Sequence, residues 1–79
     1  MTYNEIFDKV AELLLMQLPV TKEKIKPEAK LVDDLGADSA NIMILVCDIE
    51  NEFDVQVDNE MLAQVSTVDD IVKYLEKTL

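Results

Sequence analysis

The residues of this chain that could take part in chemistry gather between Asp33 and Ser39, a stretch that also holds the only glycine. Gly36 stands just before a long apolar pattern, and a lone glycine there predicts a tight turn with positive φ. Asp38 and Ser39 follow where a helix needs side-chain oxygens to cap its first N–H groups. The positive end of a helix dipole tolerates anionic groups such as phosphate. The position of Ser39 therefore suits a serine that carries a phosphodiester, although an Asp-Ser pair before an apolar run is more often an ordinary cap.

Other kinds of site are disfavoured by composition. The chain has no histidine, which excludes Ser-His-Asp and Cys-His catalysis, and Ser39 has no evident base nearby in the sequence. Cys47 is the only cysteine, so it cannot form an intramolecular disulfide, and it lacks the partners that zinc needs. The acids before Ser39 do not fit a calcium loop, because the twelfth residue from Asp33 is Ile44 and not glutamate. We therefore predict a protein that is not an enzyme and has no metal site.

Charge narrows the range of partners. Seventeen acidic residues against seven lysines give a net charge of −10, and eleven of the acids lie between Leu31 and Val72, where there is no lysine. Nucleic-acid backbones need cations opposite them, so nucleic acid is not an expected partner. A region of one sign instead produces a field that steers basic surfaces of other proteins toward it.

Three apolar patterns with helical spacing predict three main helices in a single domain, residues 1–79. Their predicted boundaries are a capping box of Thr2 and Glu5 with a stop at Pro19, then Ser39 to Phe53, and finally a capping box of Thr67 and Asp70. A short further helix is expected from Asp58 or Asn59 to about Ala63 or Gln64, with Met61, Leu62 and Val65 inward. The fold class is thus all-α, a small four-helix bundle with a long loop between the first and second helices.

The long loop, residues 20–38, should be partly ordered, because structureless links of this length are unusual in compact domains. Thr21 to Ile25 could form one helical turn. The side chains expected to hold the loop against the bundle are Ile25, Leu31, Val32 and Leu35. After the second helix, Val55 to Val57 alternates like a strand but is too short to predict one.

The second helix has more apolar residues than one buried face requires. Its core stripe should be Ile42, Leu45, Ile49 and Phe53, with Val46 beside it. Met43, Ile44 and Cys47 lie off that stripe. Either a short neighbouring helix covers them, or they form an exposed apolar patch flanked by Asp48 and Glu50. The second arrangement, an apolar centre with a charged rim, is typical of a docking surface.

The segment from Leu35 to Ser39 resembles the modification motif of acyl carrier proteins, and Phe53-Asp54 falls where that family closes its second helix. The resemblance covers essentially the whole chain. It implies that a phosphopantetheinyl transferase uses coenzyme A to attach 4′-phosphopantetheine to Ser39, and that the thiol of this arm carries acyl groups as thioesters. The family usually has leucine or another large apolar residue after the serine, where this chain has Ala40.

The resemblance also implies that the second helix recognises partners, namely the transferase and acyl-processing enzymes with basic, partly apolar docking patches. The family has an acid at the position of Ile44, so this surface is expected to be more apolar than usual. The expected recognition residues are Asp38, Ala40, Met43, Val46, Cys47, Asp48 and Glu50. Fatty-acid synthesis is the expected pathway. The alternatives are a carrier for a polyketide, nonribosomal peptide or aminoacyl-transfer pathway, and an acidic helical adaptor that is never modified.

The chain offers no sign of export or membrane insertion. Its first residues lack the basic and apolar regions of a signal peptide. The longest apolar run, Ile42 to Cys47, has six residues, far fewer than a membrane span needs. We therefore expect a cytoplasmic monomer that does not insert stably into membranes.

Overall fold

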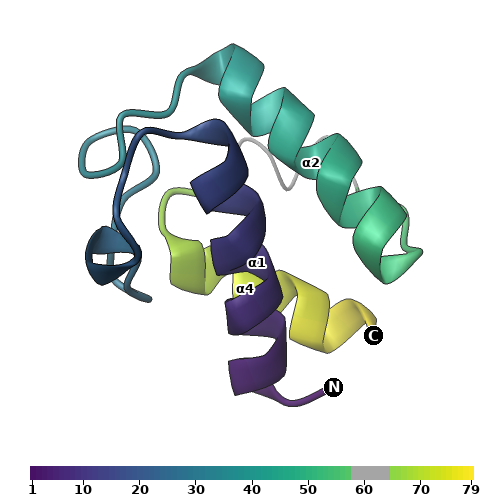
Figure 1. Ribbon diagram of the computed structural model, residues 1–79. Helices are drawn as coiled ribbons and strands as arrows, with labels where there is room; N and C mark the ends of the chain where they lie inside the picture. The colour runs from purple at the N-terminus through teal and green to yellow at the C-terminus, as the bar shows by residue number, and fades with distance from the viewer. Residues whose placement is uncertain (58–64) are drawn as a thin grey trace.

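The computed structural model describes residues 1–57 and 65–79, and these residues form three α-helices (Figure 1). They are α1 (Tyr3–Gln17), α2 (Ser39–Phe53) and α4 (Val68–Thr78), with one short 3₁₀ turn, η1 (Lys22–Lys24), in the loop after α1. These residues contain no strand, so the all-α class and the three main helices are confirmed. The short helix predicted from Asp58 or Asn59 lies outside the described residues, and the four-helix count is therefore not established.

Each of the three helices begins at a capping box. Thr2, Asp38 and Thr67 are the N-caps, and each side chain accepts a hydrogen bond from the backbone N–H three residues later. In each case the side chain of that later residue bonds back to the backbone N–H of the cap. The boxes satisfy two otherwise unpaired N–H groups at each helix start, which fixes where the helices begin.

The aliphatic core lies where α1 packs against the other two helices, since α1 contacts both α4 and α2 (Figure 1). Its helical members are Ile6, Val10, Ala11, Leu14, Leu45, Ile49, Phe53, Val68, Ile71, Val72 and Leu75. The predicted stripe of α2 is thus buried at three of its four positions, while Ile42 is only half-buried. Burial of these side chains is the main source of stability in a domain of this size.

The loop between α1 and α2 is held against the core by Ile25, Leu31 and Leu35, as predicted. Val32 is an error in the prediction, because its side chain is 58% exposed. The reason is local geometry: residues 31–35 form a helix-like turn in which the Gly36 N–H bonds to the Val32 carbonyl. Residues four apart share one face of such a turn, so Leu31 and Leu35 point inward together and Val32 points to solvent.

Backbone hydrogen bonds also join this loop to the start of α4. The Leu31 N–H bonds to the Ser66 carbonyl at 2.9 Å, and the Val68 N–H bonds to the Ala29 carbonyl at 3.0 Å. Lys30 and Thr67 consequently form an isolated antiparallel bridge. These hydrogen bonds therefore hold the loop before α2 in place relative to α4.

Tyr3 joins the first helix to the last one. Its hydroxyl donates a hydrogen bond to Asp69 Oδ1, and the other carboxylate oxygen of Asp69 lies 3.2 Å from Lys73 Nζ. Burial raises the pKa of Tyr3 to about 12, and the bond to Asp69 acts in the same direction. The same bond holds the pKa of Asp69 below its usual value.

The two chain ends lie on the same side of the molecule in Figure 1, at the lower right, whereas α2 begins at the upper side. The start of α2 is thus well separated from both ends.

Candidate functional site

The turn that leads into α2 is built as the sequence predicts. Gly36 has φ of 73°, in the region that favours glycine. A Cβ atom at this position would meet nothing within 4 Å, so the backbone conformation and not lack of space calls for glycine. Leu35 and Ala37 on either side are buried. The Ala37 N–H bonds to the Leu31 carbonyl at 2.9 Å, which fixes the chain just before the helix.

Asp38 is confirmed as the N-cap of α2. Its Oδ1 accepts a hydrogen bond from the Asn41 N–H at 2.8 Å, and Asn41 Oδ1 accepts one from the Asp38 N–H at 3.2 Å. Asn41 was not among the predicted capping residues, although the spacing Asp-x-x-Asn is visible in the sequence. Glutamate or glutamine is the usual residue at this place in a capping box. Asn41 makes the cap reciprocal and leaves Ser39 outside the cap.

Ser39 is the first residue of α2, and its side chain is exposed. Within residues 1–57 and 65–79 its hydroxyl has no hydrogen-bond partner. The first N–H groups of a helix point outward along its axis and favour an anion at this end. An exposed, unengaged hydroxyl at such a place fits attachment of a phosphodiester, because the group would stand in solvent beside these N–H groups.

The acids near this turn do not form a metal site. Asp34 Oδ2 accepts a hydrogen bond from the Lys30 N–H at 2.8 Å and so serves the turn itself. Among the residues that the structure describes, no group of three acidic or cysteine side chains is placed to hold a metal ion.

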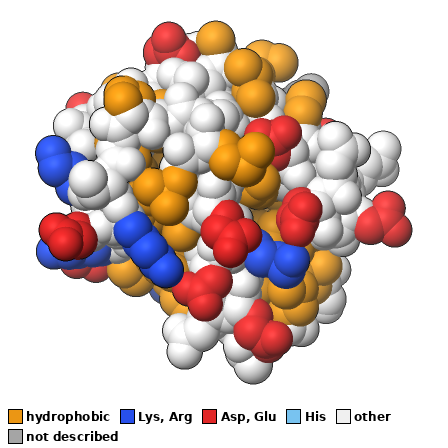
Figure 2. All heavy atoms as spheres, in the orientation of Figure 1, with side chains coloured by type: hydrophobic (Ala, Val, Ile, Leu, Met, Phe, Trp, Pro, Cys, Tyr) orange, Lys and Arg blue, Asp and Glu red, His pale blue; other side chains and the backbone are white. Residues whose placement is uncertain are grey.

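The outer face of α2 carries an exposed apolar patch, which we define as Met43, Ile44 and Cys47. Met43 is 61% exposed and Ile44 is 51% exposed, and Cys47 is exposed as well. Of the two explanations left open by the sequence, the exposed patch is therefore correct. Figure 2 shows hydrophobic and acidic side chains along the upper edge, where Figure 1 places α2, and the lysines of this view lie away from that edge, at the left and near the centre.

The structure places the predicted recognition residues in two groups. The exposed ones are Asp38, Ala40, Met43 and Cys47, and Val46 is half-buried beside them. Asp48 and Glu50 are half-buried and engaged within the protein. Asp48 Oδ2 accepts a hydrogen bond from Gln17 Nε2 of α1 at 3.2 Å, and Glu50 Oε2 accepts one from the Val57 N–H at 3.1 Å. The Asp48 carboxylate therefore links α2 to α1, and the Glu50 carboxylate links α2 to the segment that follows it.

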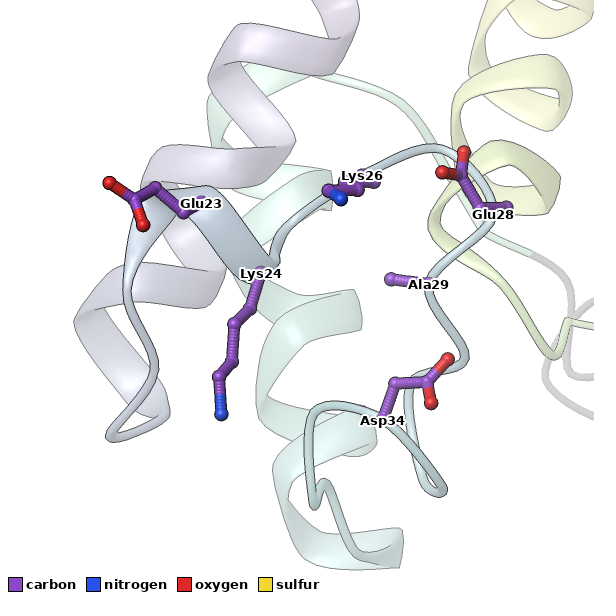
Figure 3. A pocket seen from close by; sticks show the side chains of 6 residues that line it. All are labelled: Glu23, Lys24, Lys26, Glu28, Ala29 and Asp34. Carbon is purple, nitrogen blue, oxygen red and sulfur yellow. The ribbon is translucent and has the colours of Figure 1, made fainter.

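A hollow of 450 Å³ opens elsewhere, in the loop after α1 (Figure 3). Its lining is Glu23, Lys24, Lys26, Glu28, Ala29 and Asp34. In Figure 3 Lys24 and Asp34 lie on opposite sides of the open space, Ala29 points toward it, and Glu23 points away. The lining carries both signs of charge and includes none of the predicted recognition residues.

No helix in the described part of the chain is both long and apolar enough to cross a membrane.

Comparison with known proteins gives consistent results over the full length. A family model described as "Phosphopantetheine attachment site" matches residues 8–75, which include the Gly36 turn and all of α2. The acyl carrier protein of Thermotoga maritima is 51% identical over 76 residues, covering 96% of this chain and 94% of that protein. The acyl carrier protein of Chlorobium phaeovibrioides is 44% identical over 77 residues, covering 98% and 99% of the two chains.

Solved structures agree with the sequence matches. A structure of the acyl carrier protein from Enterococcus faecalis superposes with a TM-score of 0.83 at 28% identity, and the match covers 100% of both chains. Sequence and fold together show that this chain belongs to the acyl carrier protein family, whose members have a phosphopantetheine attachment site.

Proposed function

We propose that this protein is an acyl carrier whose 4′-phosphopantetheine group is linked to Ser39 Oγ. When bound, the group supplies a terminal thiol that holds an acyl chain as a thioester. The observation that carries the assignment to Ser39 is its exposed, unengaged hydroxyl at the first position of α2. The protein supplies position and a recognisable surface and performs no catalysis of its own.

Attachment requires a partner enzyme. A phosphopantetheinyl transferase forms the bond between Ser39 Oγ and phosphorus as the pyrophosphate P–O bond of coenzyme A breaks and the nucleotide half of coenzyme A leaves. The proton of the hydroxyl has to leave, and within the described residues no side chain is placed to accept it from Ser39. We propose that the transferase provides the base. Asp38 and Gly36 contribute by holding the serine at a fixed, exposed place.

The surface of α2 supports a second part of the proposal, that successive enzymes dock there. Exposed apolar side chains of the α2 patch lie among carboxylates, and α2 itself contains no lysine. Such a surface is complementary to an apolar depression with a basic rim. We propose that Asp38, Ala40, Met43, Val46 and Cys47 contact the partner directly, and that Asp48 and Glu50 contribute mainly through their charge.

The pathway and setting are also proposals. We propose that the cargo serves fatty-acid synthesis in the cytoplasm, and that the carrier is a monomer. Full-length similarity to proteins named acyl carrier protein supports the carrier role, and the high negative charge of −10 disfavours self-association through α2.

Intact-protein mass spectrometry tests the attachment site. The chain has only two serines, Ser39 and Ser66. After incubation with a phosphopantetheinyl transferase and coenzyme A, the wild type should gain one phosphopantetheine group, and Ser39→Ala should gain none. Circular dichroism should show unchanged helix content and nearly unchanged melting for Ser39→Ala, because the side chain is exposed and makes no bond within the described residues.

Ser66→Ala is the matched control and should still be modified. Its melting temperature should fall slightly, because the Ser66 hydroxyl donates to Asp70 Oδ2 at 3.2 Å. A full mass gain in Ser39→Ala would disprove the assignment of the site.

A further inference from the structure

Gln17, the last residue of α1, has a buried oxygen with no partner. Its Nε2 donates to Asp48 Oδ2 of α2 at 3.2 Å, whereas its Oε1 is buried and accepts no hydrogen bond from any residue that the structure describes. Buried polar atoms are nearly always paired, since leaving one unpaired destabilises the folded state. The oxygen therefore calls for a donor other than the residues that the structure describes.

The orientation of the Gln17 amide is fixed by its neighbour. Reversing the amide would place Oε1 against the Asp48 carboxylate, and two acceptors would then face each other. In the observed orientation Gln17 Nε2 donates to Asp48, and Gln17 Oε1 receives no hydrogen bond from the described residues. The unpartnered atom, Gln17 Oε1, is an acceptor, so a ligand that bonds to it must bring a hydroxyl, an ammonium or an amide N–H.

The pair lies within reach of the arm. Asp48 follows Ser39 by nine residues on the same helix, an axial distance of about 14 Å at 1.5 Å per residue. The extended arm with its cargo can cover this distance. The neighbours of Asp48 along α2 include the buried Leu45 and Ile49, so the Gln17–Asp48 pair borders the apolar core.

Resting on the proposed function, we infer that Gln17 Oε1 accepts a hydrogen bond from a donor on the tethered group, so that this carrier holds donor-bearing cargo, such as a 3-hydroxyacyl chain, better than a purely apolar acyl chain of equal length. Gln17 would thus be a specificity-determining residue on α1, far in sequence from the attachment serine. The donor is either on the cargo or on an amide N–H of the arm, and the two sources are separable.

The experiment compares four forms of the protein: unmodified, carrying the arm alone, and carrying hexanoyl or 3-hydroxyhexanoyl arms loaded by the transferase from the corresponding coenzyme A thioesters. Loading is first verified by mass. The readouts are the melting temperature and the two NMR signals of the Gln17 side-chain NH₂, which respond when a bond forms at the neighbouring oxygen. We expect the hydroxyl to move these signals and to raise the melting temperature above that of the hexanoyl form by roughly 2–8 °C.

Gln17→Leu should abolish the difference between the two cargoes, and the control Gln56→Leu, at an exposed position, should preserve it. The NMR readout on the wild type keeps the test valid if Gln17→Leu does not fold. A response already present with the arm alone, and equal for the two cargoes, assigns the donor to the arm amides and overturns the preference for donor-bearing cargo. A Gln17 signal that is the same in all four forms overturns the inference, since a buried water would then satisfy the oxygen. Failure to load at all overturns the proposed function instead.

Discussion

Three neighbouring residues at the start of α2 have three distinct physical tasks. Gly36 adopts a φ of 73°, Asp38 caps the helix, and Ser39 presents its hydroxyl to solvent. The surrounding structure cannot perform these tasks in place of the three residues, because each task depends on the side chain or on the lack of one. The position of the hydroxyl is therefore set within four residues of chain.

Gly36→Ala tests the turn. The new methyl group would meet no atom within 4 Å, so its effect is conformational only and should lower the free energy of unfolding by about 1 kcal/mol. Urea denaturation followed by circular dichroism measures this change. Gly36→Asn is the matched control and should lose less, because asparagine tolerates left-handed backbone. Equal stability of Gly36→Ala and wild type would contradict a requirement for positive φ.

At this scale the turn and the cap were predictable from the sequence, whereas the orientation of Val32 and the partner of Gln17 were not. The glycine turn and the Asp38 cap follow from local backbone chemistry, and both predictions are confirmed. Val32 was placed in the core because it is apolar, but the turn around it directs it outward. The bond of Gln17 to Asp48 joins residues 31 positions apart and has no local signature.

Helix α1 contacts both of the other described helices. Toward α4 it makes the Tyr3–Asp69 hydrogen bond. Toward α2 it makes the Gln17–Asp48 bond and an exposed ion pair, Lys9 to Glu52 at 2.9 Å. The exposed pair contributes little, as surface ion pairs generally do. The bonds at the two ends of α1 therefore set its register against its neighbours.

The Tyr3 bond predicts a loss of stability at alkaline pH. An unfolded tyrosine loses its proton near pH 10, whereas the folded protein keeps the Tyr3 proton until about pH 12. Between these values the unfolded state binds fewer protons, so stability falls as pH rises. The contribution of the bond is fully present below pH 10. Urea denaturation at a series of pH values from 8 to about 12 measures the decline.

Tyr3→Phe provides the comparison for that series. It should be less stable than the wild type at neutral pH and should show a smaller decline above pH 10, since the shifted hydroxyl is gone. The other tyrosine, Tyr74, is present in both proteins and cancels in the comparison. Identical alkaline declines would mean that Tyr3 is not the titrating group.

The helices themselves were largely predictable because their signals are local. Thr2, Asp38 and Thr67 are capping residues at the right spacing, and Pro19 stops α1 from continuing. The bridge between Lys30 and Thr67 was not predictable, since it joins loop segments far apart in sequence with no strand pattern in either. The helical turn that Thr21 to Ile25 could form is present as the 3₁₀ turn η1, Lys22–Lys24.

On the scale of the whole molecule, charge is distributed unevenly. Four of the seven lysines lie between residues 22 and 30, whereas α2 has acids and no lysine. The net charge of −10 produces self-repulsion that opposes the compact state. The same field attracts basic partners and weakens as salt is added.

Divalent cations should relieve this repulsion. We expect millimolar magnesium or calcium to raise the melting temperature by several degrees more than sodium chloride at matched ionic strength, because doubly charged ions screen clustered carboxylates better. Differential scanning calorimetry measures the effect. Potassium at the same ionic strength is a further control and should behave like sodium. A melting temperature that depends on ionic strength alone would rule the effect out.

The placement of the two chain ends has a practical consequence. Both emerge on the side of the molecule away from the start of α2 (Figure 1). An affinity handle, a fluorescent label or a link to a sensor chip joined at either end would leave the serine and its neighbours facing the bulk solution. Captured by one end, the protein can thus be offered to candidate enzymes with its working surface unobstructed.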